Sequence, residues 1–106
     1  MGLKINHWDI CWASVKYEDI KKFKTRPIVI LFENENIFTA LKCTTHYPRN
    51  NFDYQLKYCE EYNLKKITIV RTNKLICVPS KDIIRKIGKL RIDDILSINN
   101  LLKKST

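Results

Sequence analysis

Short strand-forming runs follow one another through most of the chain, and only its last segment has the periodicity of a helix. Each run is rich in β-branched and aromatic residues, and turn-forming residues separate neighbouring runs. No helix alternates with the strands, as a parallel βαβ fold would require. The pattern therefore predicts a small, strongly bent antiparallel barrel or sheet. The expected strands are residues 8–15, 27–32, 37–44, 67–71 and 74–79.

The segments between these strands are mostly polar. The lysine-rich residues 16–25 predict an exposed loop, and the sequence ENEN at 33–36 predicts a hairpin turn. A second loop is expected over residues 46–53, which contain Pro48 and an Asn pair. Residues 54–63 fit a short strand followed by a turn of helix.

Two helical segments are expected in the last part of the chain. Residues 80–88 predict a short helical turn, because a serine begins them and a glycine ends them. Residues 92–103 predict an amphipathic helix, because apolar residues recur at positions i, i+3 and i+7 from Ile95. Asp93 and Asp94 in its first turn suit the positive end of the helix dipole.

Length and charge limit the class of protein. With 106 residues the chain can form one modest core, so residues 1–106 are expected to be a single domain. Lys and Arg number 20 against 11 Asp and Glu, which gives a formal net charge of +9. This surplus indicates nucleic acid or an acidic protein as partner, although a lysine-rich solvated surface explains it equally well. No signal segment and no apolar run of about 18 residues occurs, which favours a cytoplasmic protein without a membrane contact.

The four cysteines do not suggest a metal site. None forms a CxxC pair, and neither histidine lies at metal-ligand spacing from a cysteine. Cys11, Cys43 and Cys77 stand in apolar runs, where a free thiol behaves as a small hydrophobe. We therefore expect reduced cysteines in the core of a cytosolic protein.

Arg26 stands directly before an apolar strand, where a core needs no charge. The ENEN turn pairs its two flanking strands in antiparallel, so the start of the first lies beside the end of the second. Arg26 is therefore expected next to Thr44 and Thr45. Pro27 fixes its own φ and restricts the residue before it, which holds Arg26 in an extended conformation.

A guanidinium beside a hydroxyl suits phosphodiester chemistry. Arginine binds phosphate through two hydrogen bonds and stays charged at any cellular pH. RNA supplies its own nucleophile, the 2′-hydroxyl, so an enzyme can cleave it without a metal by positioning, charge neutralisation and proton transfer. Arg26 could neutralise charge on the phosphorus oxygens, Thr44 could donate a hydrogen bond to one of them, and His46 could exchange a proton.

Each of these residues also has an ordinary structural explanation. Arg26 would pair with a surface carboxylate, and Arg71 would only balance a carboxylate. The two threonines would serve as β-branched strand residues, and His46 would be a solvated loop residue. The residue types alone leave both explanations open.

Five segments, in order along the chain, carry a pattern that residue types alone do not. Residues 8–12 (WDICW) are similar to Gly-Asp-Ile-x-Trp, and residues 25–30 (TRPIVI) to Arg-Pro-Val-Leu-Val. Residues 42–46 (KCTTH) are similar to Lys-Ile-Thr-Ser-His, and residues 69–75 (IVRTNKL) to Val-Val-Arg-x-Asp-Lys. Residues 85–90 (RKIGKL) are similar to Arg-Lys-Ile-Gly-Arg-Leu. Together these segments resemble the MazF/PemK toxins of bacterial toxin–antitoxin systems.

The resemblance implies a fold and an activity. The fold is a homodimer of a small SH3-like antiparallel barrel, mainly β with short helices. The activity is that of a metal-independent endoribonuclease without a cofactor, which cuts single-stranded RNA selectively and leaves a 2′,3′-cyclic phosphate and a 5′-hydroxyl. The implied partner is an acidic cognate antitoxin that covers the RNA groove.

The predicted site follows from these matches. By position, Arg26 matches the catalytic arginine, Thr44 the catalytic threonine and Thr45 the adjacent hydroxyl, and Arg71 matches an arginine that some branches use for catalysis or RNA binding. The catalytic candidates are Arg26, Thr44, Thr45 and His46. Lysines would contact the RNA backbone, and aromatic side chains would stack on bases. The RNA-binding candidates are Lys16, Lys21, Lys22, Phe23, Lys24, Tyr47, Arg49, Arg71 and Asn73.

Three positions depart from the family pattern. Trp8 replaces the first glycine, and Arg91 replaces a serine that caps the last helix. Asn73 stands where some branches have a carboxylate as general base, which leaves His46 or Arg26 as proton acceptor. The last change keeps a catalytically inactive RNA- or protein-binding barrel as an alternative. A second alternative is a CcdB-like toxin that targets a protein, but the chain ends in LLKKST rather than the Trp-Gly-Ile of that group.

Overall fold

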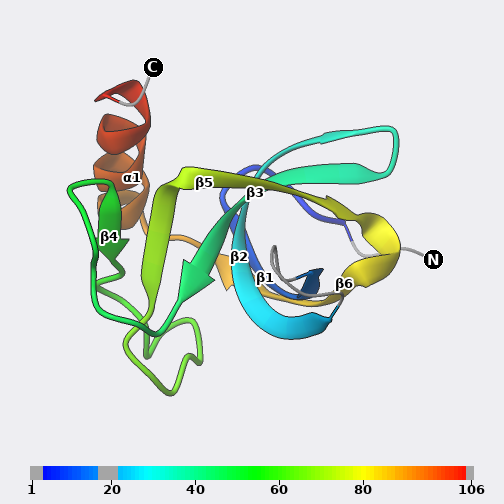
Figure 1. Ribbon diagram of the computed structural model, residues 1–106, viewed down its shortest axis with the longest axis horizontal. Helices are drawn as coiled ribbons and strands as arrows, with labels where there is room; N and C mark the ends of the chain where they lie inside the picture. Colours follow the sequence, from blue (N-terminus) through cyan, green and yellow to red (C-terminus); the bar gives the residue numbers. More distant parts are fainter. Residues whose placement is uncertain (1–3, 17–21, 105–106) are drawn as a thin grey trace.

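One antiparallel sheet and one helix make up the fold (Figure 1). The computed structural model describes residues 4–16 and 22–104. The helix, α1, spans Ile92–Lys104, and a single 3-10 turn, η1, spans Ser80–Asp82. The strands are β1 (Asp9–Lys16), β2 (Phe23–Asn34), β3 (Ile37–Thr44), β4 (Asp53–Gln55), β5 (Ile69–Pro79) and β6 (Ile83–Lys89).

The sheet is open. Its strand order is β4-β5-β3-β2-β1-β6, and every neighbouring pair is antiparallel. The prediction of a mainly β, antiparallel fold with an amphipathic C-terminal helix is confirmed. The described strands nevertheless do not close into a complete barrel, because β4 and β6 remain the two edges.

The sheet bends at irregularities in its strand pairing. Register shifts occur between Ile30 and Phe32 of β2 and between Leu41 and Cys43 of β3, and two more interrupt the β1–β6 pairing. Extra residues of this kind bend a strand and increase its twist. The curvature they produce is visible in Figure 1, where β5 turns sharply along its length.

The structure corrects three predicted boundaries. β5 is one strand, and the break predicted at Thr72 and Asn73 coincides with the irregular pairing opposite β3. β2 begins at Phe23, so the end of the predicted loop 16–25 belongs to a strand. The prediction of a helical turn over residues 80–88 was wrong, because only Ser80–Asp82 form a 3-10 turn and the rest pairs with β1 as β6.

The predicted hairpin turn is confirmed. Asn34 pairs with Ile37, so the loop consists of Glu35 and Asn36 alone. Both have positive φ, 50° and 66°. This is the geometry of a type I′ turn, which matches the twist of the flanking strands. The turn sets the register of the strand ends beside it, and the shift between Ile30 and Phe32 changes that register by one residue toward the start of β2.

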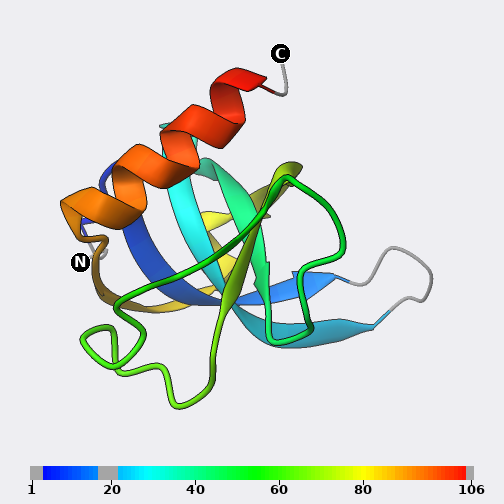
Figure 2. The ribbon, with the colours of Figure 1, turned by 90° about the vertical axis from the view of Figure 1, so that its left-hand side faces the viewer.

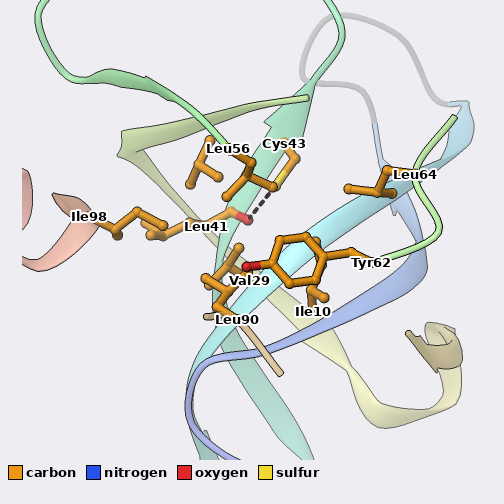
Figure 3. Packing of buried hydrophobic residues seen from close by; sticks show 10 residues of the cluster. Ile10, Val29, Leu41, Cys43, Leu56, Tyr62, Leu64, Leu90 and Ile98 are labelled. Carbon is orange, nitrogen blue, oxygen red and sulfur yellow. Dashed lines mark hydrogen bonds between the residues drawn. The ribbon is translucent and has the colours of Figure 1, made fainter. Parts of the chain in front are cut away.

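Both faces of the central strands are buried. Since side chains alternate along a strand, Val29 and Leu41 face one way and Ile28 and Ala40 the other. The first face is covered by α1 and by the segment between β4 and β5, which lie on the same side of the sheet in Figures 1 and 2. Figure 3 shows Ile98 of α1 and Tyr62 of this segment in that cluster.

The cysteine predictions are partly confirmed. Cys11 and Cys43 are buried, and burial raises the pKa of the Cys11 thiol to about 11. Cys77 is exposed, contrary to the prediction, because it lies on the outward face of β5. All four are free thiols.

Trp8 has a conformation that favours glycine. Its φ is 70°, and its backbone is bonded to the Ile30 carbonyl and the Leu90 amide. A side chain in this region costs about 1–2 kcal/mol, which a glycine avoids. The next residue, Asp9, is 1% exposed and pairs with Lys86 of β6 at 3.1 Å. The Gly-Asp pattern therefore has a structural reason at the start of β1, and Trp8 departs from it at a cost in strain.

No helix in the described residues is long and apolar enough to cross a membrane.

Candidate active site

A cleft of about 440 Å³ opens where the start of β2 meets the end of β3. We call its two sides the strand wall and the loop wall. The strand wall consists of Lys24, Thr25, Arg26, Pro27, Cys43, Thr44 and Thr45. The loop wall, between β4 and β5, consists of Asn63, Leu64, Lys65, Lys66 and Thr68. Trp12 of β1 and Arg85 of β6 complete the lining.

The β2–β3 register places Arg26 beside Thr44. Ile28 pairs with Lys42, and the same register continued by two residues puts Arg26 opposite Thr44. Arg26 is half-buried and Thr44 is 7% exposed. The Thr44 hydroxyl accepts a hydrogen bond from the His46 backbone N–H at 3.3 Å. Because that bond uses a lone pair, the hydroxyl keeps its own proton to donate to a ligand.

The cleft is strongly cationic. Five of its lining residues carry a positive charge, and none of the described lining residues is Asp or Glu. Charges of one sign in a concave site attract and retain ions of the opposite sign. The cleft is therefore suited to an anionic ligand. The five cations are Lys24, Arg26, Lys65, Lys66 and Arg85.

Cys43 is not a nucleophile, although it lines the cleft. Burial raises the pKa of its thiol far above the ordinary value, and Cys59 adds to the effect. The positive charge of Arg26 acts in the opposite direction on this pKa. A protonated thiol does not attack a substrate.

The loop wall is tied to the first turn of α1 through Asp94. The Asp94 carboxylate is fully buried, and it accepts hydrogen bonds from the Tyr54 hydroxyl at 2.6 Å and the Tyr62 hydroxyl at 2.8 Å. A third comes from the Lys57 backbone N–H at 3.1 Å. Burial and the bond to Asp94 raise the pKa of Tyr54 to about 12. Asp94 thus joins the helix to the segment that supplies the loop wall.

The predicted departure at Arg91 is compensated by the same network. The Arg91 carbonyl accepts the bond from the Ile95 N–H, so Arg91 is the cap residue of α1. Its backbone N–H donates to the Tyr62 hydroxyl at 2.7 Å. A tyrosine from the loop thereby satisfies a backbone donor at the start of the helix.

His46 and Tyr47 line a separate depression of about 460 Å³, which we call the side hollow. It shares Thr45 and Lys66 with the cleft. Tyr47 is 91% exposed, so its ring is available to a ligand. A strand-like ligand in the cleft could therefore extend past His46 without leaving the surface.

Arg71 does not line the cleft. Its Nε lies 3.6 Å from Oδ1 of Asp53, opposite it on β4, and the Asp53 side chain is 1% exposed. The other oxygen of Asp53 accepts the Arg49 backbone N–H at 2.9 Å. Arg71 thus balances a buried carboxylate, which agrees with the structural explanation given for it above.

The comparisons with known proteins agree with the geometry. The family described as PemK-like, MazF-like toxin of type II toxin-antitoxin system matches residues 6–106. The chain belongs to this family. None of the curated proteins has a significant sequence match to it.

Solved structures of toxins share the fold of this toxin. The first is an endoribonuclease in complex with its cognate antitoxin from a mycobacterial species: TM-score 0.76, 11% identity, 96% of this chain and 94% of that chain covered. The toxin MazF-mt6 of Mycobacterium tuberculosis has a TM-score of 0.70 and 16% identity, covering 90% and 94%. At these identities the likeness establishes the fold.

The structure brings together part of the predicted site of this toxin. Arg26, Thr44, Thr45 and Lys24 line the cleft, and His46 and Tyr47 line the side hollow. Lys21 lies outside the described residues. The other candidates are not among the residues that line the cleft: Lys16, Lys22, Phe23, Arg49, Arg71 and Asn73.

Sequence reasoning missed Lys65, Lys66 and Arg85, which line the cleft of this toxin. The lysine pair lies in a segment without periodicity, and Arg85 lies in the segment predicted as helical. The one signal that could have found Arg85 was the alternative assignment of residues 83–89 to a strand beside β1, where Arg85 faces Trp12.

No three His, Cys, Asp or Glu side chains come together as a possible metal site within residues 4–16 and 22–104.

Proposed function

We propose that this toxin is a metal-independent, sequence-selective endoribonuclease acting on single-stranded RNA. The observation that supports it most strongly is that Arg26 and Thr44 line one cationic cleft. A cleft of this charge attracts the phosphodiester backbone. The family of the chain, and the endoribonucleases with the same fold, support the same activity.

The proposed reaction uses the 2′-hydroxyl of the substrate as nucleophile. Its oxygen attacks the adjacent phosphorus, the bond to the 5′-oxygen breaks, and the products are a 2′,3′-cyclic phosphate and a 5′-hydroxyl. Arg26 neutralises the charge that develops on the nonbridging oxygens, and the Thr44 hydroxyl donates a hydrogen bond to one of them. These groups are held in place by the β2–β3 register before RNA binds, so little reorganisation is needed.

Proton transfer is proposed for His46. No described cleft-lining residue is a carboxylate, and Asn73 lies outside the lining. His46 is the remaining candidate near the cleft, because an imidazole can both accept and donate a proton, and it would act from the side hollow. If His46→Gln kept the wild-type pH–rate profile, this role would pass to Arg26.

Three further expectations belong to the same proposal. The cognate antitoxin is an acidic protein that covers the cleft, because the toxin carries a net charge of +9. The toxin forms a homodimer, as the resemblance implies. It acts in the cytoplasm, where its messenger RNA substrates are.

The test is cleavage of a varied pool of single-stranded RNA by the purified toxin in excess EDTA. We expect fragments with 5′-hydroxyl ends, which a polynucleotide kinase labels without prior phosphatase treatment. A matched pool with 2′-O-methyl groups should remain intact, because its nucleophile is blocked. Intact RNA across the unmodified pool would contradict the proposed endoribonuclease activity.

A further inference from the structure

The loop wall is positioned to contribute to RNA binding. It brings two adjacent lysines, Lys65 and Lys66, into the cleft that contains Arg26. Both are exposed side chains, so their ammonium groups remain hydrated and available to phosphate oxygens. Lys66 also lines the side hollow, so it lies on the route between the two depressions.

The loop wall belongs to the segment between β4 and β5, which has no ladder of strand-to-strand hydrogen bonds. Its backbone is held by isolated bonds, such as those from the Leu56 N–H to the Thr68 carbonyl at 3.0 Å and from the Leu64 N–H to the Cys59 carbonyl at 2.9 Å. Asn63 has a φ of 56°, which few non-glycine residues adopt. A segment of this kind depends on side-chain contacts for its position.

Leu56 and Leu64 pack in the core, and three polar contacts of this region meet at Asp94. Its carboxylate is 0% exposed and accepts bonds from Tyr54 at one end of the segment and from Lys57 and Tyr62 within it. Tyr62 directly precedes the loop wall, and its ring is buried in the cluster of Figure 3. Removing the acceptor would leave the buried Tyr62 hydroxyl without a partner for its proton, which is costly because water does not replace it there.

We propose that Asp94 is a positioning residue for RNA binding. Through Tyr54, Tyr62 and the Lys57 backbone it holds the loop wall, so that Lys65 and Lys66 contact two phosphates of an RNA bound in the cleft. The choice of RNA as ligand rests on the proposed function. The anchor is more than 25 residues away in sequence from the lysines that it positions, and it does not itself line the cleft.

Binding is measured so that cleavage does not enter. The probe is a fluorescently labelled, single-stranded 2′-O-methyl RNA pool, whose Kd is determined between about 50 and 200 mM salt. Each phosphate contact on a single strand contributes a slope of about −0.7 to log K against log salt. Replacing both lysines, as Lys65→Gln with Lys66→Gln, is therefore expected to reduce the slope by about 1.4.

Asp94→Asn keeps the shape of the side chain, but it replaces one of the two acceptor oxygens with an amide nitrogen that can only donate a hydrogen bond. We expect it to reduce the slope by a similar amount, and to weaken binding at low salt about tenfold. In the triple variant with both lysine changes the slope should not fall further. A loss of general stability would not produce this non-additivity.

The matched control is Asp93→Asn. Asp93 lies in the same helical turn, and its change alters the net charge by the same amount, but its partner is the hydroxyl of Tyr58 in an exposed contact. The wild-type slope and Kd are expected for this control. If Asp94→Asn does not fold, the pair Tyr54→Phe and Tyr62→Phe removes two of the three bonds to Asp94 and leaves the rings in place.

The outcomes separate this inference from the proposed function. An unchanged salt slope in Asp94→Asn and in the double tyrosine variant overturns the positioning role, even if the toxin cuts RNA. Wild-type toxin that binds with the expected slopes but leaves unmodified RNA intact overturns the nuclease and preserves the positioning role.

Discussion

Arg26 and Arg71 both lie near the start of a long strand and both match arginines of the family pattern, yet the fold gives them different surroundings. Arg26 lines a cleft whose described lining includes five cations and no carboxylate. Arg71 faces Asp53 across the β4–β5 pair, 3.6 Å from its carboxylate. The same residue type thus meets opposite electrostatic environments in one small sheet.

The difference shows what decides the role of an arginine in a strand. An arginine beside a buried carboxylate is already neutralised, and removing it leaves an uncompensated charge. An arginine in a cationic cleft adds to a field that attracts anions. The strand opposite the arginine, rather than its own position in a strand, determines which case applies.

Arg26→Ala is expected to have the largest effect, a loss of about a thousandfold in the cleavage rate, about 4 kcal/mol in the barrier. The cause is loss of the charge that neutralises the phosphorus oxygens. Single-turnover cleavage of RNA measures it, with thermal unfolding as a check that the fold is intact. Arg26→Lys keeps the charge but loses the bidentate geometry, so its cleavage rate should lie between those of the wild type and Arg26→Ala. Near wild-type cleavage rates in Arg26→Ala would show that Arg26 is no more important for cleavage than Arg71.

Thr44→Val should lower the same rate by about a hundredfold, because it keeps the shape and removes the hydroxyl that donates to the phosphate. Thr44→Ser restores a hydroxyl and should recover most of the activity. Thr45→Val is the matched control, since Thr45 lines the cleft but is exposed and has the smaller expected effect. If the two valine variants exchange their phenotypes, Thr45 is the catalytic hydroxyl.

Arg71→Met should lower the stability of the fold rather than the cleavage rate, which is the reverse of the pattern expected for Arg26→Ala. We expect the unfolding free energy to fall by about 2 kcal/mol, because Asp53 is left buried without its cation. The cleavage rate of the folded protein should change by less than about threefold. Urea unfolding measures the first quantity, and adding Asp53→Asn should recover part of the loss. A large drop in rate with unchanged stability would make Arg71 an RNA-binding residue after all.

The smallest effect is expected at the hairpin. Asn36→Gly relieves the positive φ of 66° and should raise the unfolding free energy by about 0.5–1 kcal/mol. The gain should add to the loss in Arg71→Met, because the two described sites share no hydrogen bond or ion pair. Urea midpoints of the single and double variants measure it. An altered cleavage rate in Asn36→Gly alone would show that the hairpin affects the cleft.

The pairing of Arg26 with Thr44 could be predicted because it needs only local information. A two-residue turn fixes the register of the strands next to it, so the sequence ENEN brings Arg26 close to Thr44 and Thr45. Only the register shift between Ile30 and Phe32, which the sequence did not reveal, decides that Arg26 lies opposite Thr44 rather than Thr45. The C-terminal helix could be predicted for a similar reason, since the periodicity around Ile95 and Ile98 lies within one segment.

The missed residues depend on tertiary contacts. Residues 83–89 form a strand because β1 offers a free edge, and pairing of that kind overrides local signals such as Ser80 and Gly88. Lys65 and Lys66 reach the cleft because Asp94 holds their segment. No pattern in residues 54–68 predicts that contact. The partner of Arg71 was equally hidden, because Asp53 lies on a strand of three residues.

The Asp94 anchor has a consequence for the order in which the toxin matures. A ribosome adds about 5–20 residues per second from the N-terminus, so Asp94 appears several seconds after Thr44. Until then Tyr54 and Tyr62 lack the acceptor that Asp94 provides, and the lysine pair is not held in place. A nascent chain would thus contain the residues of the strand wall early and gain its full affinity for RNA late.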